Sequence, residues 1–237
     1  MRLTLVCALV LGLMAPVAAP AQGCSWQAGW VKEENAKAGN KGWDSDVVMR
    51  FSADFSRRKE AKRVEGYFDQ TSIGCGQSAT LKIVGAKSAD VSLYRIGYYR
   101  GAGARLIQTI KSAKKITATQ STPPGQYLVK LKSPGYRSSF VPLVITGQVP
   151  SNVTFVSSVL TWQAYNQWGG ESLYKGADGQ RETRATSVSL DRPYDGDGSG
   201  QFRYMEQPLV QLMEQLNLDI NYLTDIDLDK APEINSA

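Results

Sequence analysis

The pattern of apolar residues changes once along the chain, near residues 147–152, and this change limits the folds that are available. Before it, apolar and polar residues alternate in short stretches such as Leu81 and Ile83, and Gly/Pro turn clusters separate the stretches. After it comes an apolar, β-branched run at residues 153–160, which is typical of a strand buried on both faces of a parallel sheet. We therefore predict two differently built parts.

The first part has the pattern of an antiparallel β-sandwich. The period of two recurs at Val91 and Leu93 and again near residues 127–131, whereas residues 57–63 are charged and indicate an exposed connection. Short strands separated by turns every few residues are typical of sandwiches. We predict an immunoglobulin-like (Ig-like) β-sandwich over residues 22–149.

The second part, residues 150–237, follows the order strand, long excursion, helix, strand. Helical spacing appears after Pro208, which is allowed in a first turn, and residues 220–223 return to a strand pattern. The excursion at residues 161–207 is far longer than the two to six residues, roughly, that such connections usually need. It leaves the carboxyl end of a strand, where α/β sheets bind ligands.

This second part is too small to form a complete doubly wound layer. Two parallel strands and one helix cannot cover both faces of a sheet. We therefore predict an incomplete α/β part, to be completed by a missing C-terminal segment or by a second chain.

The N-terminus resembles a secretory signal. Arg2 precedes an apolar run at residues 3–13, which is too short to span a bilayer, and small residues at 19–21 suggest cleavage after Ala21. We predict a periplasmic or secreted protein without a membrane anchor. A lipoprotein signal ending at Gly23-Cys24 is the alternative.

Cleavage would leave Cys24 and Cys75 in the mature chain. An even number of cysteines in an oxidising compartment favours one disulfide, and two buried thiols are the alternative.

The composition excludes several kinds of chemistry. The chain has no histidine, which removes Ser-His-Asp triads and His-zinc sites within it. Residues 23–150 hold 20 Lys and Arg against 9 Asp and Glu, whereas residues 151–237 hold 6 against 13. The basic charges are spread among strand-like segments with few interleaved aromatic residues, so we expect no nucleic-acid partner.

The excursion begins with an aromatic stretch, TWQAYNQWGGESLY, at residues 161–174. Such a loop either packs between domains or forms the rim of an active site, with Tyr165 and Asn166 pointing inward. A tyrosine can donate a hydrogen bond or, as phenolate, bind a hard trivalent metal. On the second interpretation, Tyr165 and Asn166 are the candidate catalytic residues.

A second stretch of the excursion matches the spacing of a calcium loop. The ligand positions would be occupied by Asp195, Asp197, Ser199, the backbone of Gln201, and Glu206. Gly200 would take the turn position. No helix precedes this stretch, and Asp/Gly/Ser clusters also form ordinary turns, so both interpretations stay open.

Several segments resemble one family of enzymes. The segments GYFDQTSIGCGQ (66–77), YRIGYYRGAGARL (94–106), PPGQYLVKL (123–131), TWQAYNQWGGESLY (161–174), SLDRPY (189–194) and EQPLVQLMEQLNLDINYLTDIDL (206–228) are similar, in order, to the large, catalytic subunit of N,N-dimethylformamidase and its relatives. The resemblance implies an α/β part similar to class I glutamine amidotransferases.

The resemblance also implies hydrolysis of a small amide C–N bond at a mononuclear ferric iron held by two tyrosines and a glutamate. The matching tyrosine ligands are Tyr165 and either Tyr204 or Tyr194. The glutamate-bearing motif of the family lies beyond residue 237, so we expect a C-terminally truncated chain that is inactive by itself. The alternative is a secreted β-sandwich binding module with a calcium-stabilised loop and no catalysis.

Overall fold

The structure is a computed structural model of the chain, and it describes residues 25–47 and 62–230. The predicted signal peptide, Cys24 and most of the charged segment 57–63 lie outside these residues. Cys75, the described half of the predicted bridge, is disulfide-bonded.

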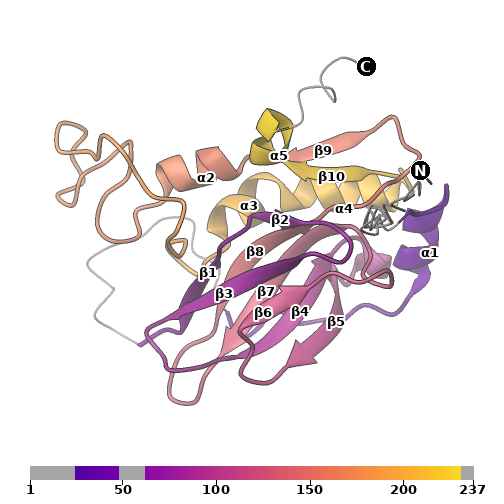
Figure 1. Cartoon of the computed structure of the whole chain (residues 1–237), viewed down its shortest axis with the longest axis horizontal. Coiled ribbons are helices and arrows are strands. Elements are labelled where there is room, and N and C mark those ends of the chain that lie inside the picture. Colours follow the sequence, from indigo (N-terminus) through magenta and orange to yellow (C-terminus); the bar gives the residue numbers. More distant parts are fainter. Residues whose placement is uncertain (1–24, 48–61, 231–237) are drawn as a thin grey trace, which may run out of the picture.

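Two β-sheets make up the first part (Figure 1). The smaller sheet is antiparallel, with the order β1 (Glu65–Phe68), β3 (Ser78–Val84), β6 (Lys115–Thr117). The larger sheet has the order β2 (Ser72–Ile73), β8 (Ser139–Ile145), β7 (Gly125–Lys132), β4 (Asp90–Ile96), β5 (Ala104–Ile110). Its neighbours are antiparallel except β2 and β8.

The alternating sequence pattern produces the core between these sheets. Leu81 of the smaller sheet, and Val91 and Leu93 of the larger, are buried in one apolar cluster. The intervening residues of β4 are only partly buried, as a period of two requires. The strands predicted around residues 81–83, 91–93 and 127–131 are confirmed.

The second part packs on the opposite face of the larger sheet. It contains the parallel strands β9 (Thr154–Ser157) and β10 (Asn221–Thr224) and the helices α3 (Gly200–Met205) and α4 (Gln207–Gln215). Phe155 and Tyr222 from these strands share a second apolar cluster with Leu128 and Phe140 of the larger sheet. The larger sheet therefore covers the inner face of the parallel pair, and one core contains residues from both sides of residue 150.

The prediction for one element of this part was wrong. The run at residues 153–160 is not a single strand, because β9 ends at Ser157 and helix α2 (Val159–Tyr165) begins two residues later. The helix predicted after Pro208 is confirmed as α4, and residues 225–230 form the short helix α5 (Asp225–Lys230).

A buried ion pair joins the two parts. Arg95 of β4 and Glu214 of α4 are fully buried and lie 2.6 Å apart (Nη2 to Oε1). Glu214 also accepts hydrogen bonds from Tyr222 and from Asn35, which lies in α1 (Trp30–Ala36). The same network holds η2 (Tyr99–Gly101), since Tyr99 donates to Glu34 of α1.

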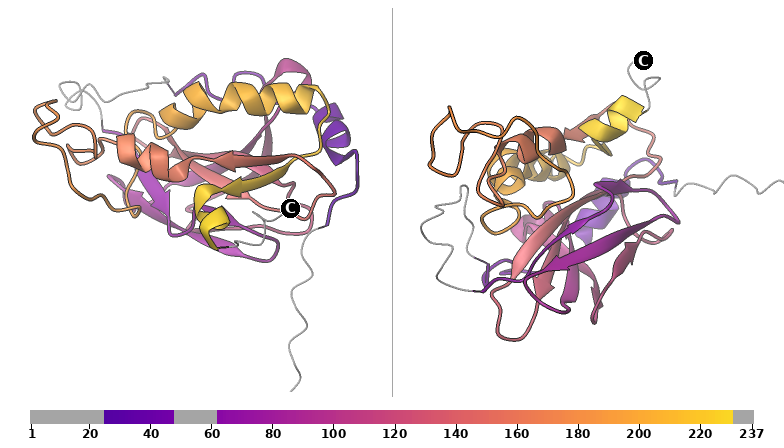
Figure 2. Two further views of the ribbon diagram at one scale, coloured as in Figure 1. Left: turned by 90° about the horizontal axis from the view of Figure 1, so that it is seen from above. Right: turned by 60° about the vertical axis from the view of Figure 1, so that its left-hand side comes forward.

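The described residues form a mixed α/β fold with several sheets and no closed barrel. The Ig-like and glutamine amidotransferase-like assignments remain predictions. The long connection at residues 166–199 projects from one end of the body (Figures 1 and 2). No described helix is long and apolar enough to cross a membrane.

Candidate functional site

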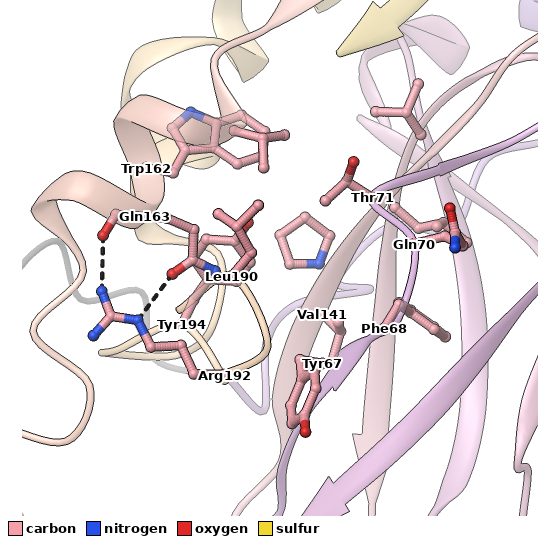
Figure 3. Close-up of a pocket in the computed structure, with 14 residues that line it drawn as sticks. Tyr67, Phe68, Gln70, Thr71, Val141, Trp162, Gln163, Leu190, Arg192 and Tyr194 are labelled. Atoms are coloured by element: carbon pink, nitrogen blue, oxygen red, sulfur yellow. Dashed lines mark hydrogen bonds between the residues drawn. The ribbon is translucent and has the colours of Figure 1, made fainter. Parts of the chain in front are cut away.

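A narrow pocket opens where the two parts meet, near the base of the projecting connection (Figure 3). The sheet side contributes Tyr67, Phe68 and residues 141–144 of β8, and the other side contributes Trp162, Gln163, Arg192 and Tyr194. The interior has room for about one water molecule. A second small pocket, which shares Trp162 and Tyr194, continues toward the start of α3.

The pocket lies beside the carboxyl ends of the parallel strands because α2 begins directly after β9. Two carboxylates from distant parts of the chain bind the first N–H groups of this helix. Ser158 N donates to Glu206 Oε1 (3.2 Å), and Leu160 N donates to Asp225 Oδ2 (2.9 Å). These bonds satisfy N–H groups that have no partner inside the helix, and they explain why β-branched residues adopt a helix here.

Glu206, at the junction of α3 and α4, lines neither pocket, but it bonds to Trp162, which lines both. Its Oε1 accepts a second hydrogen bond, from Trp162 Nε1 (2.9 Å). Its Oε2 is buried and has no hydrogen-bond partner among the described residues. Burial raises the pKa of Glu206, although the bonds from Ser158 and Trp162 oppose this effect. A buried carboxylate oxygen without a partner is available to a water molecule or a ligand.

Arg192 holds the end of α2 in place. Its Nη2 donates to the carbonyl oxygens of Gln163 (2.8 Å) and Asn166 (3.0 Å), and its Nε donates to Gln163 Oε1 (3.2 Å; Figure 3). Burial lowers the pKa of the guanidinium, while Asp195 opposes the shift. A cation at the carboxyl end of a helix is favourable, so Arg192 fixes the wall of the pocket.

Tyr194 lines both pockets as a neutral phenol. Its ring meets that of Trp162 edge-on, with the centroids 6.2 Å apart. Burial raises the pKa of Tyr194 well above its ordinary value, against a hydrogen bond from Gln163 that lowers it. The charges of Asp225 and Glu206 raise it further. Tyr194, Glu206 and Asp225 therefore form one electrostatically coupled group of oxygen donors.

The other predicted tyrosines are more exposed. Tyr165 is the last residue of α2, with 45% of its surface exposed, and its ring stacks on Tyr174 at a centroid distance of 4.0 Å. A hydrogen bond that the Tyr165 hydroxyl donates to Tyr174 raises the pKa of Tyr165. Tyr204 lies on α3 and is 49% exposed.

Asn166 is fully buried, and its side chain organises the connection. Its Nδ2 donates to Gln163 Oε1 and to the carbonyl of Pro193, both at 2.9 Å. Its Oδ1 accepts from Asp195 N (2.9 Å) and Trp168 N (3.0 Å). Both donors and the acceptor are engaged, which favours a positioning role for Asn166.

The residues of the predicted calcium loop have other partners. Asp197 accepts from Ser199 N (2.9 Å) and from Arg203 Nη1 (3.1 Å), and Asp195 accepts from Gln167 N (3.0 Å). Gln201 lies in α3, and Glu206 turns toward Trp162. Because an arginine contacts the carboxylate of Asp197, the arrangement favours a turn that starts α3.

A glycine fixes this turn against the sheet. Gly198 has φ +86°, and a Cβ at this position would collide with the carbonyl oxygen of Phe140 in β8. Phe140 N in turn donates to the carbonyl of Asp197 at 2.8 Å. The turn therefore approaches β8 as closely as backbone allows.

Sequence reasoning missed Arg192 and Asp225 and gave Glu206 a different role. The sequence did contain a sign of the role of Arg192, because a basic side chain that follows a helix can bond to the carbonyl groups at its carboxyl end. The roles of Glu206 and Asp225 depend on contacts with Ser158 and Leu160, which lie 48 and 65 residues away. Among the described residues, no group of three or more Cys, Asp or Glu is arranged to hold a metal ion.

Comparison with known proteins gives one match. A family described as N,N-dimethylformamidase beta subunit-like, C-terminal, matches residues 90–237. The description names the beta subunit, so the assignment to a large, catalytic subunit is not confirmed. No curated protein matches the chain.

Proposed function

The chain belongs to the N,N-dimethylformamidase beta subunit-like family, and from this membership we propose that it takes part in the hydrolysis of a small amide C–N bond. The reaction would take place at the pocket between β8, α2 and the connection that carries Arg192 and Tyr194. The interior has room for about one water molecule, so a substrate would have to bind at the mouth of the pocket, which favours a small substrate.

The observation that carries the proposal is the state of Glu206. A general base needs a lone pair that no protein donor occupies, a pKa raised toward the working pH and a fixed position. Glu206 has a buried oxygen without a partner among the described residues, a raised pKa, and an Oε1 fixed by Trp162 and Ser158. We assign Glu206 as the base and Asn166 and Arg192 as positioning residues.

In this mechanism the Glu206 carboxylate takes a proton from water while the water oxygen attacks the amide carbon. The tetrahedral intermediate then breaks its C–N bond, and the proton passes to the leaving nitrogen. The products are a carboxylic acid and an amine. Tyr194, kept neutral by burial, is the candidate donor of a hydrogen bond to the developing oxyanion.

The iron implied by the family remains part of the proposal. Hard oxygen donors suit Fe(III); the tyrosines that the resemblance offers are the half-exposed Tyr165 and Tyr204 and the buried Tyr194, whose raised pKa disfavours the phenolate that a ferric ligand requires. Bound by them, ferric iron would polarise the carbonyl and acidify a bound water. Metal analysis and a tyrosinate absorption band in the purified protein test this part separately.

The deciding experiment compares Glu206→Gln with the wild-type protein, measuring release of dimethylamine from N,N-dimethylformamide. Loss of a general base lowers the rate by about 100-fold or more. The matched control is Glu171→Gln, which changes an exposed carboxyl on the projecting connection of residues 166–199 and should keep the wild-type rate. Wild-type activity should rise with pH around a midpoint above the ordinary value for glutamate, because the pKa of Glu206 is raised.

Two outcomes would overturn the assignment. A folded Glu206→Gln protein, checked by circular dichroism, that keeps the wild-type rate removes Glu206 as the base. A wild-type protein that releases no amine from several small amides removes the hydrolytic function of this chain by itself.

We also propose export and completion of the parallel sheet by further protein. The disulfide at Cys75 supports an oxidising compartment. Among the described residues the parallel sheet has only two strands, and the outer side chains Val156 and Leu223 are partly buried. A parallel pair normally needs neighbouring strands. Detection of the chain in a periplasmic fraction, and slower amide exchange in β10 when a partner is added, are the tests.

A further inference from the structure

A further hollow lies at the opposite end of the parallel strands from the candidate site. It is an open groove with a cavity volume of about 630 Å³, and sites for small ligands usually have about 300–1,000 Å³. Its walls come from the first described residues (25–27), from the link between the two parts (147–150), and from β9 and β10. We call this hollow the amino-end groove.

The amino-end groove lies over the starts of β9 and β10. Thr154 and Asn221, the first residues of these strands, line it together with Leu223. Figure 1 shows the starts of the strands on the side of α1, whereas α2, beside the candidate site, follows the other end of β9. The groove shares no residue with either small pocket, so an inference from it does not rest on the proposed function.

Backbone hydrogen bonds hold the walls of the groove in place. Trp26 N donates to Gln148 O (2.9 Å), which ties the first described residues to the link between the parts. Asn221 N donates to Val153 O (2.9 Å), and Ser151 Oγ accepts from Val153 N at the same distance. A ligand that binds between fixed walls orders little of the protein, so it loses less of its affinity to entropy.

The lining of the groove has no ionisable side chain. Half of its residues carry an amide or a hydroxyl group, and these are Ser25, Gln27, Gln148, Thr154 and Asn221. Amide and hydroxyl side chains can both donate and accept hydrogen bonds. A ligand that matches them is uncharged and carries several groups that also donate and accept, as hydroxyl groups do.

Trp26 adds an apolar surface to this polar lining. It is only partly buried, and its ring packs against that of Trp30 with the centroids 5.4 Å apart. Pro150 and Leu223 extend the apolar surface. A sugar ring has C–H groups on its faces and hydroxyl groups around its rim, so it can pack on an indole while it bonds to amides.

We propose that the amino-end groove binds a short neutral oligosaccharide, with Trp26 as the stacking surface and Gln27 and Gln148 as hydrogen-bonding groups. A charged ligand would find no opposite charge in the lining. A wholly apolar ligand would cover amide and hydroxyl groups without replacing their bonds to water. A peptide that pairs as a strand needs a free sheet edge, but both strands line the groove with side chains of one face.

The first test is isothermal titration calorimetry of the protein with four neutral trisaccharides: maltotriose, cellotriose, mannotriose and triacetylchitotriose. We expect at least one dissociation constant below about 1 mM, unchanged between about 50 and 500 mM salt because no charge takes part. Trp26→Ala should raise that constant at least about tenfold. The matched control is Trp168→Ala, which removes a partly buried tryptophan of the projecting connection and should leave binding unchanged.

A second variant separates binding from folding, because Trp26 also packs against Trp30. Gln27→Ala/Gln148→Ala removes two exposed amides of the groove and should weaken binding by about tenfold. Its matched control is Gln108→Ala/Gln215→Ala, which removes two exposed amides outside the groove. Circular dichroism establishes that all variants are folded.

The proposal fails if none of the four sugars binds at about 10 mM, a concentration at which even weak sites fill. It also fails if the sugar binds Trp26→Ala and the double glutamine variant as well as it binds the wild type. A dissociation constant that rises steeply with salt would indicate a site for a charged ligand instead. Binding of an apolar fluorescent dye that Trp26→Ala abolishes, without binding of any sugar, would replace the oligosaccharide with an apolar ligand.

Discussion

Replacing Glu214 with alanine should destabilise the fold more than any surface change, because it leaves Arg95 charged in the interior. Glu214 Oε1 accepts from Arg95 Nη2 and Tyr222 OH, both at 2.6 Å. Glu214 Oε2 accepts from Asn35 Nδ2 (2.9 Å) and Arg95 Nη1 (3.1 Å). Removing one partner of a buried ion pair costs about 3–5 kcal/mol. For a protein of this size that loss lowers the melting temperature by about 6–20 °C.

The assay is urea unfolding followed by circular dichroism, with thermal melting as a second measure. Asp90→Asn, which breaks the exposed pair between Asp90 and Lys111, is the control and should leave the unfolding midpoint unchanged. Arg95→Met/Glu214→Leu should recover much of the loss, because apolar residues can replace a buried pair. A Glu214→Ala protein that loses less than about 1 kcal/mol would refute the claim that this pair is desolvated and fully bonded.

Three further predictions concern the turn, the predicted calcium loop and pH. Gly198→Ala should cost about 2 kcal/mol or more in urea unfolding, because its Cβ would meet backbone. Gly179 has a similar φ of +81°, but a Cβ there would meet open space, so Gly179→Ala should lower the free energy of unfolding by only about 1 kcal/mol. Millimolar calcium should leave the melting temperature unchanged, because the carboxylate of Asp197 already bonds to protein donors. A rise of several degrees in the melting temperature would support the predicted calcium loop instead. Burial opposes ionisation of Glu34, but the charge of Arg95 and the hydrogen bonds from Lys37 and Arg105 together outweigh it and lower the pKa of Glu34. The stabilisation that Glu34 contributes is therefore present above about pH 4.3 and is lost as the pH falls through the lowered folded-state value. Glu34→Gln should flatten the acid side of the curve of unfolding free energy against pH, and an unchanged curve would contradict this assignment.

The sequence predicted those elements whose pattern is local. Alternation around Leu81 and Val91 identified β3 and β4, and the spacing after Pro208 identified α4. The parallel pairing of the strands near residues 154 and 221 followed from the strand, helix, strand order. For the single elements, the residues that determine the structure are neighbours in sequence, so the apolar period was sufficient. The pairing of β9 with β10 followed instead from the order of elements along the chain.

The sequence could not predict structure that distant residues impose. Val159 and Leu160 continue a β-branched run, yet they start a helix because Asp225 bonds to the N–H of Leu160. The pKa of Glu206 likewise depends on distant residues: burial raises it, and the hydrogen bond from Trp162, 44 residues earlier, opposes the rise. The calcium loop stays a prediction from spacing; in the structure Asp197 bonds to Ser199 and Arg203, contacts that the spacing did not predict. Tertiary contacts override local patterns at these positions.

The position of the buried ion pair also limits how this protein could change by recombination. Arg95 lies before the change of pattern near residue 150, and Glu214 lies after it. A crossover at that point would separate Arg95 from Glu214 and leave one buried charge without its ion-pair partner in each product. Such a product would be destabilised unless the incoming half supplied a replacement partner.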